Sequence, residues 1–320
     1  MNIQQPEQRL IFNGTYSYVF TVFTATYNRG HTLHRVYESL KTQTYCNFEW
    51  LIVDDGSTDK TRELIRLWQQ ENLFPIRYIY QENRGKHTAF NLGVKEAQGR
   101  FFLNLDSDDG CVPEALERFK HYWDTISEEQ KDNFSAVTCL CKDQHGKIVG
   151  NYFPFNPTDS NSLEIRYRYK AVGEKWGFHR TDVLRIFPFS EAITQTCIPE
   201  SLVWNKIAKK YQTRYVNEAL RIYWIEELSL ASGGNPSRNS IGRRIAHLTV
   251  LNEEIDWLPV APIKFFRSAI NYSRNCFHLG INMNDQFKAI DTAVGKSLWL
   301  ITLPGGYLAY LLGMLGILKG

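Results

Sequence analysis

Short apolar runs alternate with amphipathic stretches from Tyr18 to about Lys142. This alternation is typical of strands and helices stacked into a mostly parallel sheet. The apolar runs are rich in β-branched and aromatic residues, and they predict strands at Tyr18–Thr24, Phe48–Val53, Ile76–Tyr80, Arg100–Leu105 and Ala136–Leu140. The stretches between them have apolar residues at helical spacing and predict helices over about His31–Thr42, Asp59–Gln70 and Lys86–Ala97. The fold class of this part is therefore expected to be α/β.

The alternation weakens after Asp143 and resumes with a strand-like Trp176–His179 and a helix near Ser201–Lys210. We expect this part to complete the sheet and to build the second wall of a cleft. A cluster of Gly, Asn and Ser after Ser229 predicts a loop. The helices expected beyond it are Ile241–Asp256 and Pro262–Ile281.

The chain has 320 residues, of which 43% are apolar, so it can bury a large core. We expect one α/β domain over residues 1–228, with halves of about 18–142 and 143–228, and a helical C-terminal region over 229–320. The net charge of +3 is too small to indicate a nucleic-acid partner.

The six cysteines are scattered without a CxxC pair, which argues against a zinc site and a thioredoxin-like motif. They are expected to be ordinary buried thiols. The first ten residues contain Glu7 and several glutamines, where a secretory signal needs a basic patch and then an apolar run. The sequence therefore predicts a cytoplasmic protein.

One segment near the C-terminus is apolar enough to meet a bilayer. Leu298 to Leu318 contains no charged residue and lies between Lys296 and Lys319. Pro304 and the two glycines after it are expected to kink or break a helix. A re-entrant or surface-lying hairpin therefore competes with a single span, and a buried pair of helices is the third alternative.

Polar clusters follow three of the predicted strands: Ala25–Gly30 (ATYNRG), Asp54–Asp59 (DDGSTD) and Asp106–Gly110 (DSDDG). Ligands of open parallel sheets bind where the strands end at their carboxyl edge. Neighbouring carboxylates raise each other's pKa unless a cation neutralises them. Asp106 and Asp108 therefore suit a Mg²⁺ or Mn²⁺ ion that also binds a diphosphate. For each cluster taken singly, a solvated turn is the alternative.

A fourth cluster, Asn83–His87, offers Arg84, Lys86 or His87 to phosphate. It is not a P-loop, because Tyr80 stands where glycine is required and His87 where Ser or Thr is required. The sequence also contains no GxGxxG motif, which argues against a dinucleotide-dependent oxidoreductase. The ordered combination of four clusters is a stronger signal than any one of them.

The arrangement resembles family 2 of the glycosyltransferases, enzymes of the GT-A fold that use nucleotide-activated sugars. The resemblance rests on VFTATYNRG, FEWLIVDDGSTDKT, ENRGKHTAFNLGVKEAQGRFFLNLDSDD and Pro113. It is close from about Tyr18 to Trp123 and extends more loosely to about Tyr223, through Trp176–Arg180, IPESLVWNKIAKKY and LRIY. It implies a Rossmann-like, mostly parallel sheet flanked by helices, with a helical C-terminal extension.

The resemblance also implies roles for single residues. Ala25, Thr26 and Tyr27 would contact the nucleoside, with Tyr27 near the base. Asp55 would accept a hydrogen bond from the pyrimidine ring, and Asp54 would support that loop. Asp106 and Asp108 would be the DxD pair of the family, with Asp108 as the direct metal ligand. The implied nucleotide-binding and metal-binding set is Ala25, Thr26, Tyr27, Asp54, Asp55, Arg84, Lys86, Asp106 and Asp108.

Members of this family usually place a catalytic base in a Glu-Asp pair before a helix across the cleft. The matching stretch here has Glu200 but Ser201 in place of Asp. Glu200 is therefore the expected base, with Glu191 and Asp182 as fallbacks. The alternative for Glu200 is a structural role at a helix N-terminus, where the helix dipole favours an acidic side chain.

The implied reaction is an inverting, metal-dependent transfer, in which a carboxylate deprotonates an acceptor hydroxyl that attacks the anomeric carbon. UDP is the expected nucleotide, with thymidine and guanosine forms as alternatives. The rival reading is a catalytically silent GT-A domain that binds a nucleotide or a partner at the membrane, which the missing Asp after Glu200 keeps open. Three aligned carboxylate clusters favour the enzyme.

Residues 262–281 interleave Lys264, Arg267 and Arg274 with aromatic and aliphatic residues, which suits the surface of an anionic membrane. A helix packed on the domain with a solvated basic face is the alternative. Together with the apolar tail, this pattern predicts a peripheral protein at the inner face of the cell membrane. The resemblance then suggests a glycan or lipid-linked saccharide acceptor, as in surface polysaccharide biosynthesis.

Overall fold

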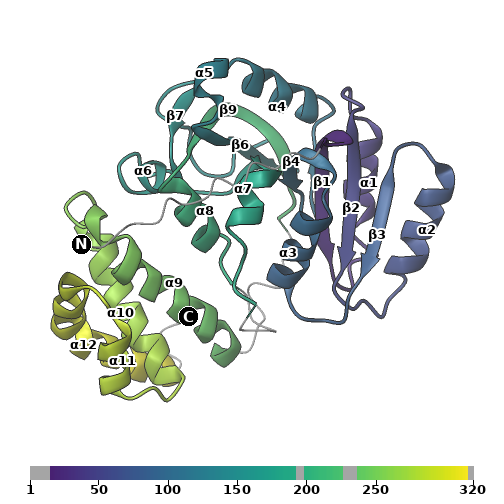
Figure 1. Cartoon of the computed structure of the whole chain (residues 1–320). Coiled ribbons are helices and arrows are strands. Elements are labelled where there is room, and N and C mark those ends of the chain that lie inside the picture. Colours follow the sequence, from purple (N-terminus) through teal and green to yellow (C-terminus); the bar gives the residue numbers. More distant parts are fainter. Residues whose placement is uncertain (1–14, 192–197, 226–235, 316–320) are drawn as a thin grey trace, which may run out of the picture.

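The computed structural model describes residues 15–191, 198–225 and 236–315 (Figure 1). Its centre is one mixed sheet in the order β3-β2-β1-β4-β8-β6-β9-β5, with β7 paired to β9. In that order the strands are Ile76–Tyr80, Phe48–Asp54, Tyr18–Thr26, Gly99–Asn104, Lys175–Arg180, Phe134–Asp143, Gln212–Tyr223 and Gly110–Cys111, and β7 is Thr158–Ser160. All five strands predicted before Asp143 are present, as is the strand at Trp176–His179.

Strands β1 to β4 form a parallel half-sheet whose carboxyl ends lie at one edge. Strands β1, β2 and β3 end level, and β4 ends three residues earlier. Thr26 of β1 pairs with Asp54 of β2, and Phe23 pairs with Asn104 of β4. The residues that follow these strands therefore meet at one edge, as the sequence predicts.

Strand β8 enters the sheet between β4 and β6 and is antiparallel to both. His179 pairs with Phe102 on one side and with Ala136 on the other. The parallel order predicted from the sequence holds for β1–β4 and for β6 with β9, whereas β5, β7 and β8 make antiparallel pairs. The α/β class is confirmed, but the second half of the sheet is mixed.

Helices cover both faces of the sheet. On one face, apolar side chains at helical spacing bury α1 (His34–Lys41), α2 (Thr61–Glu71) and α4 (Ala115–Asp124). On the other face lie α3 (Lys86–Glu96), α7 (Thr181–Ile186) and α8 (Ser201–Ala208). The short helices α5 (Glu128–Lys131) and α6 (Ser162–Tyr167) complete this domain. Helices α3 and α8 bring residues from the two halves of the chain to the same face.

The C-terminal region is helical, as expected from the sequence. It contains α9 (Pro236–Glu253), the 3₁₀ helix η1 (Ile255–Trp257), α10 (Pro262–His278), α11 (Met283–Ala289) and α12 (Ala293–Met314). These helices group beside α6 and α8 and away from β1–β3 (Figure 1). Leu163 and Tyr167 of α6 join their apolar core, so the region is packed onto the α/β domain.

Helix α12 corrects one prediction. Pro304 was expected to kink or break a helix, yet α12 runs through it as one helix to Met314. Close packing on α10 supports it there: a Cβ at Gly306 would lie 2.6 Å from the Cβ of Ser273, so glycine lets the two backbones approach. The helix is long and apolar enough to cross a membrane by length and composition, and 22% of its apolar window is buried. It is therefore neither a hairpin nor a buried helical pair.

Two other differences concern single elements. Cys46 is exposed, whereas Cys111, Cys139, Cys141 and Cys276 are the buried thiols that the sequence predicts. Cys197 lies outside the described residues. The long strand β9 was not predicted, because its sequence, QTRYVNEALRIY, mixes polar and apolar residues without strict alternation.

Candidate active site

Asp54 ends strand β2, Asp55 follows it, and both hold the loops around them. The Asp54 carboxylate accepts hydrogen bonds from the amide of Ser57 at 2.8 Å and from the hydroxyl of Tyr78 at 2.7 Å. The Asp55 carboxylate accepts from the amides of Arg84 and Gly85, both at 2.9 Å. Both aspartates are buried, so in this structure they organise backbone at the carboxyl edge of the sheet.

Gly85 is needed for that loop geometry. Its φ of 102° lies in the region that favours glycine. This conformation directs its amide to Asp55 and starts helix α3 at the next residue, Lys86. The lysine is thereby presented at the N-terminus of the helix, at the same edge as the acidic residues.

The end of strand β1 offers an exposed ring and a buried hydroxyl. Tyr27 is 48% exposed, whereas Thr26 is buried and its hydroxyl has no hydrogen-bond partner within the described part of the chain. Ala25 is half-buried beside them. An exposed aromatic ring next to an unpaired hydroxyl is suited to a flat, polar ligand such as a nucleoside.

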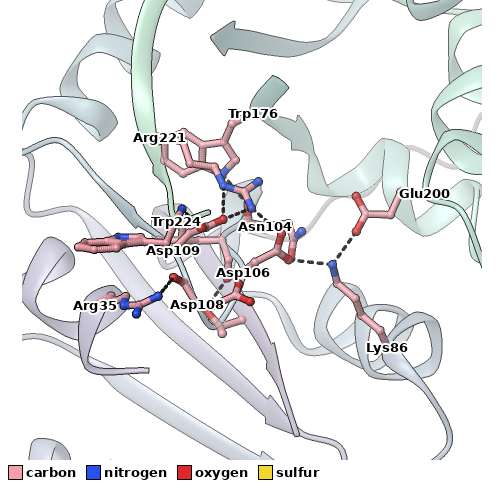
Figure 2. Close-up of polar contacts among 12 residues, drawn as sticks. Arg35, Lys86, Asn104, Asp106, Asp108, Asp109, Trp176, Glu200, Arg221 and Trp224 are labelled. Carbon is pink, nitrogen blue, oxygen red and sulfur yellow. Dashed lines mark hydrogen bonds and ion pairs between the residues drawn. The ribbon is translucent and has the colours of Figure 1, made fainter. Parts of the chain in front are cut away.

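Asp106 follows β4 and lies between two cations (Figure 2). Its two oxygens contact the ammonium of Lys86 at 2.7 Å and the guanidinium of Arg221 at 2.6 Å. Burial alone would raise the pKa of Asp106, but the two cations outweigh it and hold that pKa well below its usual range. Asp106 is therefore a carboxylate at every physiological pH.

The next two acidic residues have different environments. The Asp108 carboxylate is partly exposed and lies 3.4 Å from the guanidinium of Arg29. The guanidinium of Arg35 donates to the backbone carbonyl of Asp108 at 2.9 Å. Asp109 is buried, contacts Arg221 and accepts from the amide of Trp224 at 2.9 Å. Burial raises the pKa of Asp109 to about 6, although Arg221 opposes the shift. Asp108 is thus the acidic side chain of this turn that is open to a ligand, and Asp109 is structural.

Glu200 is brought to this edge from the other half of the chain. Its carboxylate contacts the ammonium of Lys86 at 2.9 Å, and it directly precedes helix α8 (Figure 2). Burial opposes the charge on Lys86, but Asp106 and Glu200 more than offset this and raise the pKa of its ammonium. Lys86 therefore joins the two carboxylates as a permanent cation.

Other predicted residues lie elsewhere or have other partners. Arg84 points to Glu191 at 3.2 Å, and Glu191 also accepts from Asn91 at 2.9 Å. Asp182 forms an ion pair with Arg180 at 2.6 Å, and Arg180 pairs with Phe101 near the start of β4. Asp182 is thus at the opposite end of β4 from Asp106, while Glu191 lies on the α3 side of the site.

Arg221 is the residue that our sequence analysis missed. It lies in β9, is 5% exposed and contacts both Asp106 and Asp109. The available signal was an arginine inside an apolar strand (ALRIY), because a buried charge is almost always paired. Its partners could not be read from the sequence, since β9 is more than a hundred residues from Asp106.

The carboxylates of this edge are possible ligands of a divalent metal ion. Among the described residues there is no group of three or more His, Cys, Asp or Glu side chains suited to a metal. Mg²⁺ and Mn²⁺ accept one or two carboxylates when substrate phosphates complete the shell. The open carboxylate of Asp108, with Asp106 two residues before it, fits that chemistry.

Comparison with known sequences shows the family. The profile described as "Glycosyl transferase family 2" matches residues 21–181, about half of the chain. The chain therefore belongs to family 2 of the glycosyl transferases.

Curated relatives carry the corresponding names. A protein named as an uncharacterized glycosyltransferase of Nostoc sp. is 37% identical over 169 residues, which cover 48% of this chain and 51% of that protein. One from Rickettsia felis is 43% identical over 42% of this chain and 23% of its own length. Glycosyltransferase GlyG of Streptococcus pneumoniae is 30% identical over 45% of this chain and 42% of its own length. The chain thus spans about half or less of the length of these relatives.

Solved structures share the fold over most of the chain. TarS 1–349 of S. aureus, in complex with UDP-GlcNAc, has a TM-score of 0.67 at 20% identity and covers 92% of each chain. The mannosyltransferase PcManGT from Pyrobaculum calidifontis, in complex with GDP-Man and Mn²⁺, has a TM-score of 0.52 at 17% identity and covers 92% of this chain and 81% of its own. The fold is the GT-A fold that the sequence resemblance implies.

Proposed function

We propose that the protein is an inverting glycosyltransferase that moves a sugar from a UDP donor to a hydroxyl group of a glycan or lipid-linked acceptor. The proposal rests on the ion pairs that join Asp106, Lys86 and Glu200. The ammonium group of Lys86 contacts Asp106, which follows β4, and Glu200, which comes from the other half of the chain. Transfer needs this proximity of a diphosphate site and a base.

We assign donor binding to the half over about 18–142 and acceptor binding to the half over 143–228. The exposed ring of Tyr27 and the unpaired hydroxyl of Thr26 support nucleoside binding beside Ala25. Asp55 would accept a hydrogen bond from the pyrimidine ring, Asp54 would support that loop, and Arg84 would bind phosphate. The complexes of TarS with UDP-GlcNAc and of PcManGT with GDP-Man support a nucleotide-sugar donor.

Glu200 would act as the general base. It takes the proton of the acceptor hydroxyl, whose oxygen bonds to the anomeric carbon from the side opposite the diphosphate. The bond between that carbon and the diphosphate oxygen breaks, and its electron pair leaves with the diphosphate. The ammonium of Lys86 is within reach of both carboxylates and would stabilise the charge on the leaving oxygen.

Asp108, with Asp106, would hold Mg²⁺ or Mn²⁺ against the diphosphate. When bound, such an ion supplies positive charge to the leaving group. Arg221 would keep Asp106 in place, because its guanidinium contacts Asp106 and the buried Asp109. The Mn²⁺ in the PcManGT complex supports this proposal.

The test is calorimetric titration of the protein with UDP, GDP and TDP, each with Mn²⁺ and with chelator, followed by a transfer assay on glycan and lipid-linked acceptors. Metal-dependent binding of UDP and release of UDP from a UDP-sugar would support the enzyme. Binding without turnover on any acceptor would favour the silent GT-A domain. Failure to bind any nucleotide would overturn the transferase proposal and favour the silent GT-A domain that binds a partner.

We also propose that the C-terminal region, residues 229–320, lies on the cytoplasmic surface of a membrane and brings the enzyme to a lipid-linked acceptor of surface polysaccharide assembly. Exposed apolar side chains lie along one side of α12: Leu300, Ile301, Leu308, Leu311 and Met314. The adjacent helix α10 exposes Ile263, Phe266 and Arg267. An apolar stripe flanked by basic residues suits anionic lipid.

Sedimentation with vesicles tests this surface. The full chain should bind vesicles that contain anionic lipid, and changing Ile301 and Leu308 together to Ser should weaken binding at least tenfold. The matched control changes Leu67 and Leu73, which are equally exposed on the α/β domain, to Ser. Equal binding by all three proteins would refute the membrane proposal and leave the transfer proposal standing.

A further inference from the structure

A cavity of about 220 Å³ lies beside Glu200, between the sheet and helix α8. Glu200 and Arg221 line it on the side of Asp106, so it is continuous with the candidate active site. The remaining wall contains six aromatic rings, Phe90, Phe102, Trp176, His179, Trp204 and Tyr215. It also contains aliphatic residues and the polar side chains of Asn104, Thr138, Ser162, Lys175 and Thr213. Figure 2 shows Trp176, Asn104, Glu200 and Arg221 arranged around this space.

Two buried polar atoms in this wall have no partner. Asn104 Oδ1 and His179 Nδ1 make no hydrogen bond within the described part of the chain. The rest of each residue is held firmly: the Asn104 carbonyl accepts from the indole of Trp176 at 2.6 Å, and the His179 ring stacks on Trp204 at 4.3 Å. Buried polar atoms are nearly always paired, so these two indicate a missing ligand or ordered water.

The hydrogen-bonding capacity of the two atoms is defined. Burial lowers the pKa of His179 to about 3, so the ring is neutral at physiological pH. A neutral imidazole carries one N–H donor and one acceptor nitrogen. Asn104 Oδ1 accepts only. The two atoms can therefore bind a ligand group that has one hydrogen-bond donor and one hydrogen-bond acceptor.

The size of the cavity and the apolar part of its wall narrow the class of ligand further. Pockets for whole ligands commonly measure about 300–1,000 Å³, so this cavity suits a substituent or a single ring. An acetamido group has an N–H, a carbonyl and a methyl, which match Asn104 Oδ1, His179 Nδ1 and the indole rings of the wall. A bare hydroxyl would leave the apolar wall unfilled.

We propose that this cavity is the subsite for the acetamido group of a 2-acetamido-2-deoxy sugar carried by the donor. The amide N–H donates to Asn104 Oδ1, the carbonyl accepts from the N–H form of His179 Nδ1, and the methyl packs on Trp176 and Trp204. This inference rests on the proposed function and deepens it, since it names the class of donor sugar. A site that hydrogen-bonds a substituent rejects analogues that lack it.

Calorimetry on the full chain tests the subsite with UDP, UDP-N-acetylglucosamine and UDP-glucose in the presence of Mn²⁺. The wild-type protein should bind the acetamido sugar at least tenfold more tightly than UDP-glucose. His179→Phe keeps the ring stack and Asn104→Leu keeps the volume, and each should remove most of that preference while leaving UDP affinity unchanged. His145→Phe, in the turn after β6, is the matched control and should keep the preference.

The outcomes separate the two proposals. UDP binding without any preference in the wild-type protein would overturn the subsite and leave the transferase standing. A preference that both variants retain would also overturn it. Absence of UDP binding by the wild-type protein would overturn the proposed function and the subsite together. Thermal unfolding of each variant shows whether the protein remains folded.

Discussion

Glu254 accepts a hydrogen bond from the side chain of Asn205 at 2.8 Å. Glu254 belongs to the C-terminal region, and Asn205 lies in α8, the helix that starts directly after Glu200. The Glu254 carboxylate is 2% exposed and also accepts from the hydroxyl of Tyr167 in α6. The C-terminal region is therefore hydrogen-bonded to the helix that presents the candidate base.

Glu254→Ala should lower the free energy of unfolding by about 2–4 kcal/mol, because it leaves buried groups of Asn205 and Tyr167 unpaired. Glu254→Gln keeps an oxygen for Asn205 and should lose less. Urea denaturation followed by tryptophan fluorescence measures both. If the alanine variant were as stable as the wild type, the contact would not contribute to stability.

Glu200→Gln should reduce turnover by about 10²–10⁴-fold, the usual contribution of a general base. Donor affinity should stay within a few-fold, since the amide still occupies the same place beside Lys86. The measurements are UDP release and calorimetry. Glu191→Gln, which changes a carboxylate on the α3 side of the site, is the matched control and should keep most activity. Full activity of the Glu200 variant would remove it as the base.

Asp108→Ala should abolish the dependence of UDP affinity on Mn²⁺ without lowering the melting temperature, because its side chain is partly exposed and its ion pair with Arg29 is 3.4 Å long. Titration of UDP with Mn²⁺ and with chelator measures the effect. Asp124→Ala, at the exposed end of α4, serves as control. An unchanged response to Mn²⁺ would show that Asp108 is not a metal ligand.

The contribution of His247 to stability should decline as pH falls from about 6.5 towards 4. Burial, assisted by Arg166 and Arg243, lowers the pKa of His247 in α9 to about 4, whereas in the unfolded chain it returns to about 6.5. Between these values the unfolded state binds more protons, so acid favours it. His247→Gln should remove on the order of 1–2 kcal/mol of this decline, allowing for partial exposure. Urea denaturation at pH 7 and pH 4.5 tests it, with His145→Gln as control.

The sequence was informative where function depends on position along a strand. Asp106 and Lys86 were expected at the same edge of the sheet because they follow β4 and β3, and an ion pair joins them in the structure. Local patterns also located helix α8, whereas Glu200 before it was identified from the family resemblance. Such features are encoded within a few residues of each other.

The rest depends on contacts between distant segments. The pairing of Arg221 with Asp106, and of Glu254 with Asn205, joins residues that have no shared local pattern. The continuous helix through Pro304 is another case, because packing of Gly306 on α10 outweighs a strong local preference. Tertiary contacts determine each of these three features, and such contacts cannot be read from a single sequence.

The position of β8 between β4 and β6 has a consequence for synthesis and truncation. When the ribosome has made the chain only as far as β6, the outer edge of β4 still presents unpaired backbone groups, because its neighbour, Lys175–Arg180, has not yet emerged. Exposed strand edges recruit strands of other chains. A fragment cut at the apparent boundary near residue 142 should therefore aggregate, and the shortest soluble version of the donor half must include β8.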